Sequence, residues 1–277
     1  MNTDFHLGAT AQTNSGPLAG PLAGVRILIT RPVMPASRTA QRLAGLGATP
    51  FVFPTTIIEP PADAAPLNAA LAKISDYYAA IFVSPSAVEM TLAPLGSLPK
   101  KLPAALRVFA PGPGTVEELN LRGVADVEMP DTSFDSEGLL ALPLLQASVV
   151  EGKRIVIFRG NDGRELLREV LVKRGAVVDA ITAYRRRPPN TPPTGLLELL
   201  RAGKVNALSA MSSDAITHLV PLVPAVERAT LLFTLPVFAS HQRIAATARA
   251  AGFRNVVETE AGDAGLITTL LNRAKPL

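Results

Sequence analysis

The chain of 277 residues contains no cysteine, no tryptophan and only three histidines. Without cysteine it can form neither disulfides nor thiolate metal sites, and a thiolate nucleophile is excluded. The histidines, His6, His218 and His241, do not have the spacing of metal ligands, so we expect no metal site. No apolar run approaches the roughly 20 residues that a membrane-spanning helix needs, so we expect no membrane contact.

The motifs of several enzyme classes are missing as well. There is no Walker A sequence and no Gly-x-Ser-x-Gly nucleophile elbow. Gly112-Pro113-Gly114 is not a dinucleotide fingerprint, because the third glycine is absent and a proline separates the first two. No segment resembles a secretory signal, and we therefore expect a cytoplasmic protein.

The net charge is +4, which is either a charge that favours solubility or the mark of an anionic partner. Nucleic acid is the less favoured anion. With three tyrosines and no dense stripe of lysine and arginine, the chain has few residues for base stacking or for following a phosphate backbone. An acidic small molecule fits better.

The most informative feature that is present is an internal duplication at an offset of 128 residues. Residues 24–31, GVRILITR, return as residues 152–159, GKRIVIFR, and Ser84 falls on Ser212. Repeats of solenoid proteins are shorter, roughly 20–50 residues. We therefore expect two copies of one α/β half-molecule, with a ligand-binding cleft between two lobes.

Each copy alternates short apolar runs with amphipathic segments, which is typical of parallel sheets covered by helices on both faces. The expected strands are residues 25–30, 49–53, 79–83, 107–110, 124–129, 154–158, 177–181, 207–211, 237–239 and 255–258. Expected helices include residues 36–46, 116–121 and 164–173.

Two extended segments, residues 55–61 and 183–193, follow the second expected strand of each copy and contain paired prolines. Side by side they would form a two-stranded ribbon hinge. Each lobe would then take its first βαβ unit from one copy and its other strands from the other copy, an arrangement that the pattern permits without requiring it. Lobe 1 would comprise residues 24–54 and 188–277, lobe 2 residues 58–183, and residues 1–23 would form a disordered N-terminal tail.

Polar loops follow six of the expected strands, at the edge where ligands bind in open parallel sheets. Small residues there expose backbone N–H groups, and helix N-termini favour anions. Ordinary helix caps use the same residue types and explain any one loop; six loops with arginines among them favour a polyanion. The candidate binding residues are Arg31, Ser84, Ser86, Gly112, Gly114, Thr115, Arg159, Gly160, Arg164, Ser212, Ser213, His241 and Arg243.

Tyr184 is the candidate catalytic residue. It stands at the expected end of a strand and the start of the hinge, followed by three arginines, and by position it faces the cleft. A phenol there can donate a proton or a hydrogen bond to a leaving group. An interface aromatic with a solvated hydroxyl is the alternative explanation.

Several segments, taken in order, resemble the bacterial uroporphyrinogen-III synthase family over residues 24–272. The duplication and the order of the segments carry the resemblance, rather than any single motif. The segments are residues 29–32, 81–88, 111–115, 135–140, 158–167, 184–186 and 241–245.

The resemblance implies two interleaved, flavodoxin-like lobes joined by a two-stranded ribbon, with no metal or organic cofactor. It implies an enzyme that cyclises hydroxymethylbilane, a linear polycarboxylate tetrapyrrole, to uroporphyrinogen III with ring D inverted and water lost. Tyr184 would assist loss of the hydroxyl group, and the substituted carbon of the terminal pyrrole would attack the azafulvene to give a spiro intermediate. Backbone amides at Ser84, Thr115, Gly160 and Ser212 would hold the carboxylates.

Two other functions are considered. A non-enzymatic two-lobed binding protein for an acidic small molecule would bind without turnover. A nucleotide-binding flavodoxin-like enzyme would need a phosphate loop rich in glycine and hydroxyl groups, for which only residues 159–163 remotely qualify. Among partners we expect the substrate, a transient handover from hydroxymethylbilane synthase, no nucleic acid and no membrane, with the protein itself a monomer.

Overall fold

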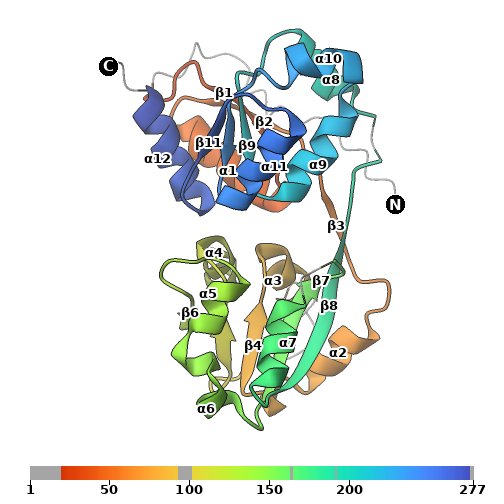
Figure 1. The fold of residues 1–277 in the computed structure, drawn as a ribbon, viewed down its shortest axis with the longest axis vertical. Coiled ribbons are helices and arrows are strands. Elements are labelled where there is room, and N and C mark those ends of the chain that lie inside the picture. The colour runs from red at the N-terminus through yellow and green to blue at the C-terminus, as the bar shows by residue number, and fades with distance from the viewer. Residues whose placement is uncertain (1–19, 93–101, 163–164, 191, 275–277) are drawn as a thin grey trace. The chain divides into compact units, whose positions relative to one another are not determined.

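The computed structural model describes residues 20–92, 102–162, 165–190 and 192–274 (Figure 1). The chain divides into two units. Unit 1 comprises Met1–Ile57 and Arg187–Leu277, and unit 2 comprises Ile58–Arg186. Unit 1 is therefore built from two separate stretches of chain, and unit 2 from one.

Unit 1 contains a sheet of five strands in the order β11-β10-β9-β1-β2, with every neighbouring pair parallel. Counted along the chain within the unit, this is the 2-1-3-4-5 order of flavodoxin-like folds. The strands are β1 (Arg26–Ile29), β2 (Thr49–Val52), β9 (Ala207–Ala210), β10 (Val237–Ala239) and β11 (Val256–Glu258). The helices are α1 (Val33–Gly45), α8 (Thr194–Arg201), α9 (Ser213–Leu222), α10 (Ala225–Leu231), α11 (Gln242–Ala251) and α12 (Gly262–Ala274).

Helices cover both faces of this sheet, because the strands are apolar on both sides. Leu28 packs into a cluster with residues of α8, α9 and α11. Its neighbours Ile27 and Ile29 point to the other face, where they pack with residues of α1 and α12. All three side chains are fully buried, and burial of apolar surface stabilises the fold by roughly 25 cal/mol per Å².

Unit 2 contains a sheet of six strands in the order β3-β8-β7-β4-β5-β6. The pairs from β8 to β6 are parallel, and β3 lies at the edge beside β8. The strands are β3 (Ile57–Glu59), β4 (Ala79–Phe82), β5 (Arg107–Phe109), β6 (Val127–Glu128), β7 (Arg154–Gly160) and β8 (Val177–Arg187). The helices are α2 (Ala65–Ala72), η1 (Ile74–Asp76), α3 (Pro85–Leu92), α4 (Pro113–Leu121), α5 (Ser136–Ala141), η2 (Pro143–Leu145), α6 (Ala147–Val150) and α7 (Leu166–Lys173).

The strands of unit 2 alternate in the same way between two clusters. Phe82 packs on the face covered by α2, α3 and α4, where its ring stacks on that of Phe158 with centroids 5.0 Å apart. Ile81 packs on the face covered by α5, α6 and α7. Tyr184 belongs to the first of these two clusters.

Both sheets combine strands from the two copies of the duplication. In unit 1, β1 of the first copy pairs with β9 of the second. In unit 2, β4 of the first copy pairs with β7 of the second. The prediction of an interleaved α/β fold with two parallel sheets is therefore confirmed.

Two strands differ from their predictions by more than two residues. The strand expected at residues 177–181 continues to Arg187, because β8 has β7 on one side and β3 on the other to pair with its backbone. The strand expected at residues 124–129 is reduced to Val127–Glu128. Gly123 and Asp126 have φ angles of 75° and 55°, which are incompatible with a strand.

The predicted disordered tail of residues 1–23 was wrong for its last four residues. Residues 20–23 form a turn in which Leu22 is fully buried, and its N–H donates to the carbonyl of Leu46 at 2.9 Å. The remaining residues, 1–19, lie outside the described part of the chain.

The predicted hinge segments have defined structure where they are described. Thr55 is buried in unit 1, where its hydroxyl donates to the carbonyls of Thr30 and Ala215 at 3.3 Å each. The carbonyl oxygen of Thr55 lies 2.9 Å from His218 Nδ1. The chain then enters β3, beside β8. In the described part of the chain, no helix is both long and apolar enough to cross a membrane.

Candidate functional site

The switch point of the unit 2 sheet lies between β7 and β4, where the chain order of the strands reverses. Ligands of open parallel sheets bind outside the carboxyl ends of the strands at such a point. Ser84 follows β4 there, and Gly160 is the last residue of β7. Both are predicted site residues, and the topology brings them to one edge.

Tyr184 lies directly against these two residues. Its Oη atom is 3.0 Å from Ser84 Oγ and accepts a hydrogen bond from Arg186 Nη2 at 2.7 Å. The Arg186 guanidinium also lies 5.3 Å from the centre of the tyrosine ring. The backbone N–H of Arg186 donates to Asn161 Oδ1 at 3.1 Å, which holds the arginine beside the loop after β7.

The predicted position of Tyr184 was wrong in two respects. The residue lies within β8 rather than at a strand end, and its side chain is fully buried rather than facing a cleft. Gly160 is the reason, because it stands opposite Tyr184 in the strand register and has no side chain. A Cβ atom at Gly160 would lie 2.9 Å from Tyr184 Cζ, so the ring occupies the space that a side chain would fill.

Ser84 also begins the neighbouring helix. Its Oγ accepts a hydrogen bond from the N–H of Ala87 at 3.1 Å, which is the geometry of an N-cap on α3. Ser84 itself is half-buried, and Ser86, also half-buried, lies in the first turn of that helix.

The loop after β5 begins α4 beside the start of α3. A Cβ atom at Gly114 would lie 3.9 Å from Pro85 Cγ, and one at Gly112 would lie 3.0 Å from Phe134 Cβ. Thr115 is buried, and its N–H already donates to the Gly112 carbonyl at 3.0 Å. The backbone amide predicted to hold a carboxylate at Thr115 is thus engaged within the loop.

Arg159 lies on β7, and its cation is paired. Its Nη1 atom donates to Glu165 Oε1 at 2.6 Å and its Nε to the Gly160 carbonyl at 3.3 Å, with 12% of the side chain exposed. Arg164, the other arginine predicted in this loop, lies outside the described residues.

In unit 1, Arg31 follows β1 at the corresponding switch point. Its guanidinium forms an ion pair with the buried carboxylate of Asp263 and donates to Thr39 Oγ1 at 3.1 Å. Thr39 donates to the same carboxylate at 2.9 Å. The predicted binding cation therefore has a buried acidic partner, which local sequence does not reveal because Asp263 lies 232 residues away.

The remaining unit 1 candidates all lie at the start of α9 or α11. Ser212 Oγ caps α9 by accepting from the N–H of Ala215 at 3.1 Å, and Ser213 Oγ accepts from Thr247 at 3.1 Å. His241 is exposed and caps α11, its Nδ1 accepting from the N–H of Arg243 at 3.1 Å. The Arg243 side chain is exposed in the first turn of α11.

The predicted residues thus form two groups. In unit 2, Ser84, Gly160 and Tyr184 are in contact, with the Gly112–Thr115 loop beside them. In unit 1, Ser213 is joined to α11 through Thr247, with Ser212 and His241 as the adjoining caps, while Arg31 pairs with Asp263. Sequence reasoning did not select Arg186, although side chains two residues apart on a strand share a face, so residue 186 joins residue 184 by the strand period alone.

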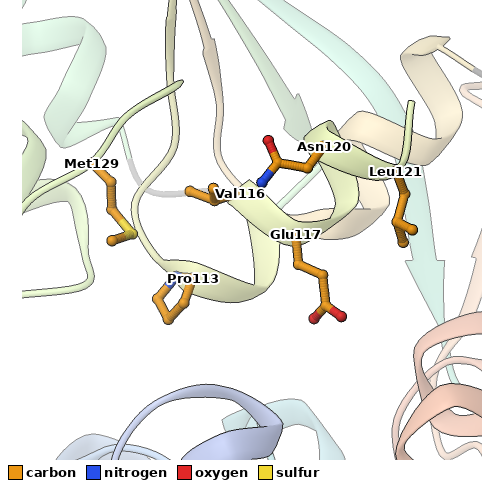
Figure 2. Close-up of a pocket in the computed structure, with 6 residues that line it drawn as sticks. All are labelled: Pro113, Val116, Glu117, Asn120, Leu121 and Met129. Carbon is orange, nitrogen blue, oxygen red and sulfur yellow. The ribbon is translucent and has the colours of Figure 1, made fainter. Parts of the chain in front are cut away.

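A shallow pocket of about 410 Å³ lies along α4 in unit 2 (Figure 2). None of the predicted site residues lines it. The pocket is lined by Pro113, Val116, Glu117, Asn120, Leu121 and Met129.

Among the described residues, no group of three or more histidine, aspartate or glutamate side chains is placed to hold a metal ion.

Comparison with known proteins gives the same family from a family model and from related sequences. A family model described as "Uroporphyrinogen-III synthase HemD" matches residues 37–268. A uroporphyrinogen-III synthase of Salmonella typhimurium is 31% identical over 239 residues, covering 86% of this chain and 96% of that protein. The chain belongs to the uroporphyrinogen-III synthase family.

Other uroporphyrinogen-III synthases support this membership. The protein from Proteus mirabilis is 35% identical over 160 residues, covering 58% of this chain and 79% of that protein. Solved uroporphyrinogen III synthases share the fold. That of Helicobacter pylori has a TM-score of 0.56 at 13% identity, covering 90% of this chain and 99% of its own, and a mutant from Thermus thermophilus has 0.54 at 21%, covering 90% and 98%.

Proposed function

We propose that the protein is a uroporphyrinogen-III synthase, which cyclises hydroxymethylbilane to uroporphyrinogen III with inversion of ring D and loss of water. Family membership carries this proposal, since the match extends over residues 37–268. Relatives of this name align with the chain over nearly their whole length.

Tyr184 is the proposed catalytic acid. The leaving hydroxyl group takes up one proton and departs as water, and the substituted carbon of the terminal pyrrole attacks the resulting azafulvene. The spiro intermediate fragments and recloses with ring D inverted, and the proton that the product releases restores the acid. The hydrogen bond from Arg186 to Tyr184 Oη supports this role, because a cationic donor stabilises the negative charge that proton loss leaves on oxygen.

The carboxylates of the substrate are the proposed ligands of the loops at the carboxyl edges of both sheets. The N-termini of α3, α4, α9 and α11 lie at these edges, and helix N-termini favour anions by about 0.3–1 kcal/mol each. The proposed binding residues remain Arg31, Ser84, Ser86, Gly112, Gly114, Thr115, Arg159, Gly160, Arg164, Ser212, Ser213, His241 and Arg243.

The larger part of the catalytic task is conformational. Unguided closure gives the non-inverted isomer I, so the protein has to hold the chain where the substituted carbon reaches the azafulvene. A tenfold excess of isomer III requires a difference of about 1.4 kcal/mol between the two barriers, which orientation of the reacting groups can supply.

The spontaneous closure of the substrate also bears on where the protein acts. Because the substrate closes unaided, we propose that the protein works in the cytoplasm beside hydroxymethylbilane synthase and receives the substrate by transient handover. We also propose that it acts as a monomer, since the duplication places both copies of the half-molecule in one chain.

The experiment that tests the function supplies the purified protein with hydroxymethylbilane generated by its upstream synthase. The oxidised products are separated by chromatography, with a reaction lacking the protein as the control for spontaneous closure. Mostly isomer III is the expected result. Only isomer I, at several protein concentrations, would contradict the proposal and favour the binding-protein alternative.

A further inference from the structure

Tyr184 raises a problem for direct proton donation. Its side chain is fully buried among residues of unit 2 that include Phe82, Ala87 and Phe158. A buried phenol cannot contact a substrate that lies outside the sheet edge. A proton from Tyr184 therefore needs a second group to carry it outward.

The hydrogen bonds of Tyr184 identify that group. Arg186 has only donors, so it must donate to Tyr184 Oη and cannot receive the phenol proton. Ser84 Oγ, at 3.0 Å, is the other polar partner of the hydroxyl group in the described structure. The phenol proton therefore points to Ser84.

Ser84 is then left with a proton of its own to donate. With Tyr184 as the donor, Ser84 Oγ accepts one bond from the phenol and a second from the N–H of Ala87 at 3.1 Å, which fills both of its acceptor positions. Among the described residues it has no acceptor for its own hydroxyl proton. Ser84 is half-buried and stands at the switch point of the sheet, so this proton is available to a ligand bound there.

We propose that Ser84 is a second catalytic residue, which passes the proton of Tyr184 to the departing hydroxyl group; this rests on the proposed function. As the C–O bond breaks, Ser84 Oγ gives its proton to the leaving oxygen, and water forms. Ser84 takes the proton of Tyr184, and the phenolate stays hydrogen-bonded to Arg186. The proton released when the macrocycle closes returns through Ser84 to Tyr184.

The duplication offers an internal comparison. Ser212 stands 128 residues after Ser84 and caps α9 in the same way, accepting from the N–H of Ala215 at 3.1 Å. The residue that corresponds to Tyr184 at this offset is Thr56, so the counterpart of Ser84 has no phenol behind it. The two serines therefore share the capping role, and only Ser84 is placed for proton transfer.

The test separates capping from proton transfer. In Ser84→Asn the amide oxygen can still cap α3, but the side chain cannot relay a proton, whereas Ser84→Thr keeps the hydroxyl group. We expect Ser84→Asn to lower kcat for isomer III about 100-fold with little change in KM, as loss of a general acid does. Ser84→Thr should recover most of the activity. Ser84→Gly, which puts another acceptable N-cap residue before α3, repeats the test if the asparagine variant is unstable.

Two comparisons sharpen the result. Tyr184→Phe should be about as slow as Ser84→Asn, and the double variant no slower than either, because residues of one relay act as a unit. Ser212→Asn, the matched change in unit 1, should alter KM rather than kcat. Melting temperatures of all variants show whether the fold is kept.

The outcomes distinguish the relay from the function beneath it. Wild-type kcat in Ser84→Asn alongside a slow Tyr184→Phe would overturn the relay and leave the synthase intact. Multiplying losses in the double variant would also overturn it, because the two residues would then act independently. Isomer I alone from the wild-type protein would contradict the function itself, and the relay with it.

Discussion

The position of the Tyr184 ring depends on the missing side chain of Gly160. A Cβ atom there would lie 2.9 Å from the ring, and the ring is fully buried, so it has little room to withdraw. We predict that Gly160→Ala lowers the free energy of unfolding by about 1–3 kcal/mol, the usual cost of overpacking. It should also lower kcat for isomer III, because the hydroxyl group moves away from Ser84. Urea denaturation and the isomer assay measure both effects.

Gly45 is the matched control for that change. It is the last residue of α1, it is exposed, and no atom lies within 4 Å of where its Cβ would be. We expect Gly45→Ala to leave activity unchanged and to stabilise the protein slightly, since it restricts the unfolded chain. Equal effects of the two substitutions would show that contact with Tyr184 is not what makes Gly160 sensitive.

Arg186 is the positioning residue for the phenol. Its Nη2 donates to Tyr184 Oη at 2.7 Å, and in the proposed mechanism it offsets the charge that proton loss would leave on that oxygen. We predict that Arg186→Gln lowers kcat at least tenfold with little change in KM, and that Arg186→Lys recovers part of the loss. Arg185→Gln is the control, because Arg185 instead donates to the Pro60 carbonyl and approaches Glu59. Steady-state kinetics measure kcat and KM of all these variants. Equal losses of kcat in Arg186→Gln and Arg185→Gln would contradict the positioning role of Arg186.

At the residue scale, the sequence selected residues that the fold brings together, but it did not show how their charges are paired. Ser84 could be selected because a loop after a buried strand is visible in the hydrophobic pattern, whereas Tyr184 was selected as a strand end and lies within β8. Arg31, Arg159 and Arg243 look alike in the sequence, yet the first pairs with Asp263 and the second with Glu165, while the third is exposed. Ion pairs form between side chains that only the tertiary fold brings together, so no local pattern distinguishes these arginines.

At the scale of elements, a polar cluster joins η1 to the beginning of β7 and β8. Tyr77 donates to Asp179 Oδ2 at 2.7 Å, and Arg154 donates to the same oxygen at 2.9 Å while lying 5.2 Å from the tyrosine ring. Burial, followed by the hydrogen bond to Asp179, raises the pKa of Tyr77 to about 12. The hydrogen bond from Tyr77, more than the bond from Arg154, holds the pKa of the Asp179 carboxyl below its usual value.

The raised pKa makes this cluster sensitive to alkali. A group whose pKa is raised on folding stabilises the fold fully below its unfolded pKa, here 10.0, and loses that contribution as pH rises through the folded value. We predict that the free energy of unfolding falls more steeply between pH 10 and pH 12 in the wild type than in Tyr77→Phe. Urea denaturation across this range measures the difference.

Tyr78 supplies the control for the alkaline range. Its hydroxyl group contacts a backbone carbonyl, that of Leu144 at 3.4 Å, rather than a carboxylate. Tyr78→Phe should therefore keep the steep wild-type decline. If Tyr77→Phe also kept it, another group would account for the alkaline loss. The Asp179 carboxyl acts at the opposite end of the scale, where its stabilisation is lost as pH falls through its depressed pKa.

The lengths of the strands show what a hydrophobic pattern cannot predict. Strand β4 is fully buried, and its apolar run places it correctly. The sequence predicts a strand at residues 177–181 and a separate extended hinge segment from residue 183, but β8 runs without a break to Arg187 because β3 and β7 pair with its two edges. Hydrophobic pattern reports which residues are buried, whereas strand length also depends on which backbone lies alongside.

At the scale of the whole molecule, the two units differ in how they can fold. Unit 2 is a single stretch of chain with its own two apolar clusters. We predict that a fragment of residues 57–187 folds by itself, with a cooperative thermal transition in circular dichroism. Residues 20–57 alone should remain unfolded, because β1 needs β9 beside it and the helices of both segments to cover the sheet. A fragment of unit 2 without a cooperative transition would contradict this independence.

The duplication was visible in the sequence, but it left the pairing of the copies open. Two separate lobes, one from each copy, have the same hydrophobic pattern as two interleaved lobes. The contact that decides is the pairing of β1 with β9, which places Ile27 beside Ala207. The pairing of strands that are far apart along the chain depends on the packing of the whole core, and the sequence of neither strand indicates its partner.

Interleaving has a consequence for how such a protein can change during evolution. Two identical half-length chains that exchanged their first βαβ units would carry the same residue at equivalent places in both units. Within one chain the two copies are free to diverge. Tyr184 forms a hydrogen bond with Ser84 in unit 2, whereas the hydroxyl of its counterpart Thr56 lies 3.2 Å from His218 Nδ1 in unit 1. A duplication held within one chain thus lets equivalent positions of the two units change independently of each other.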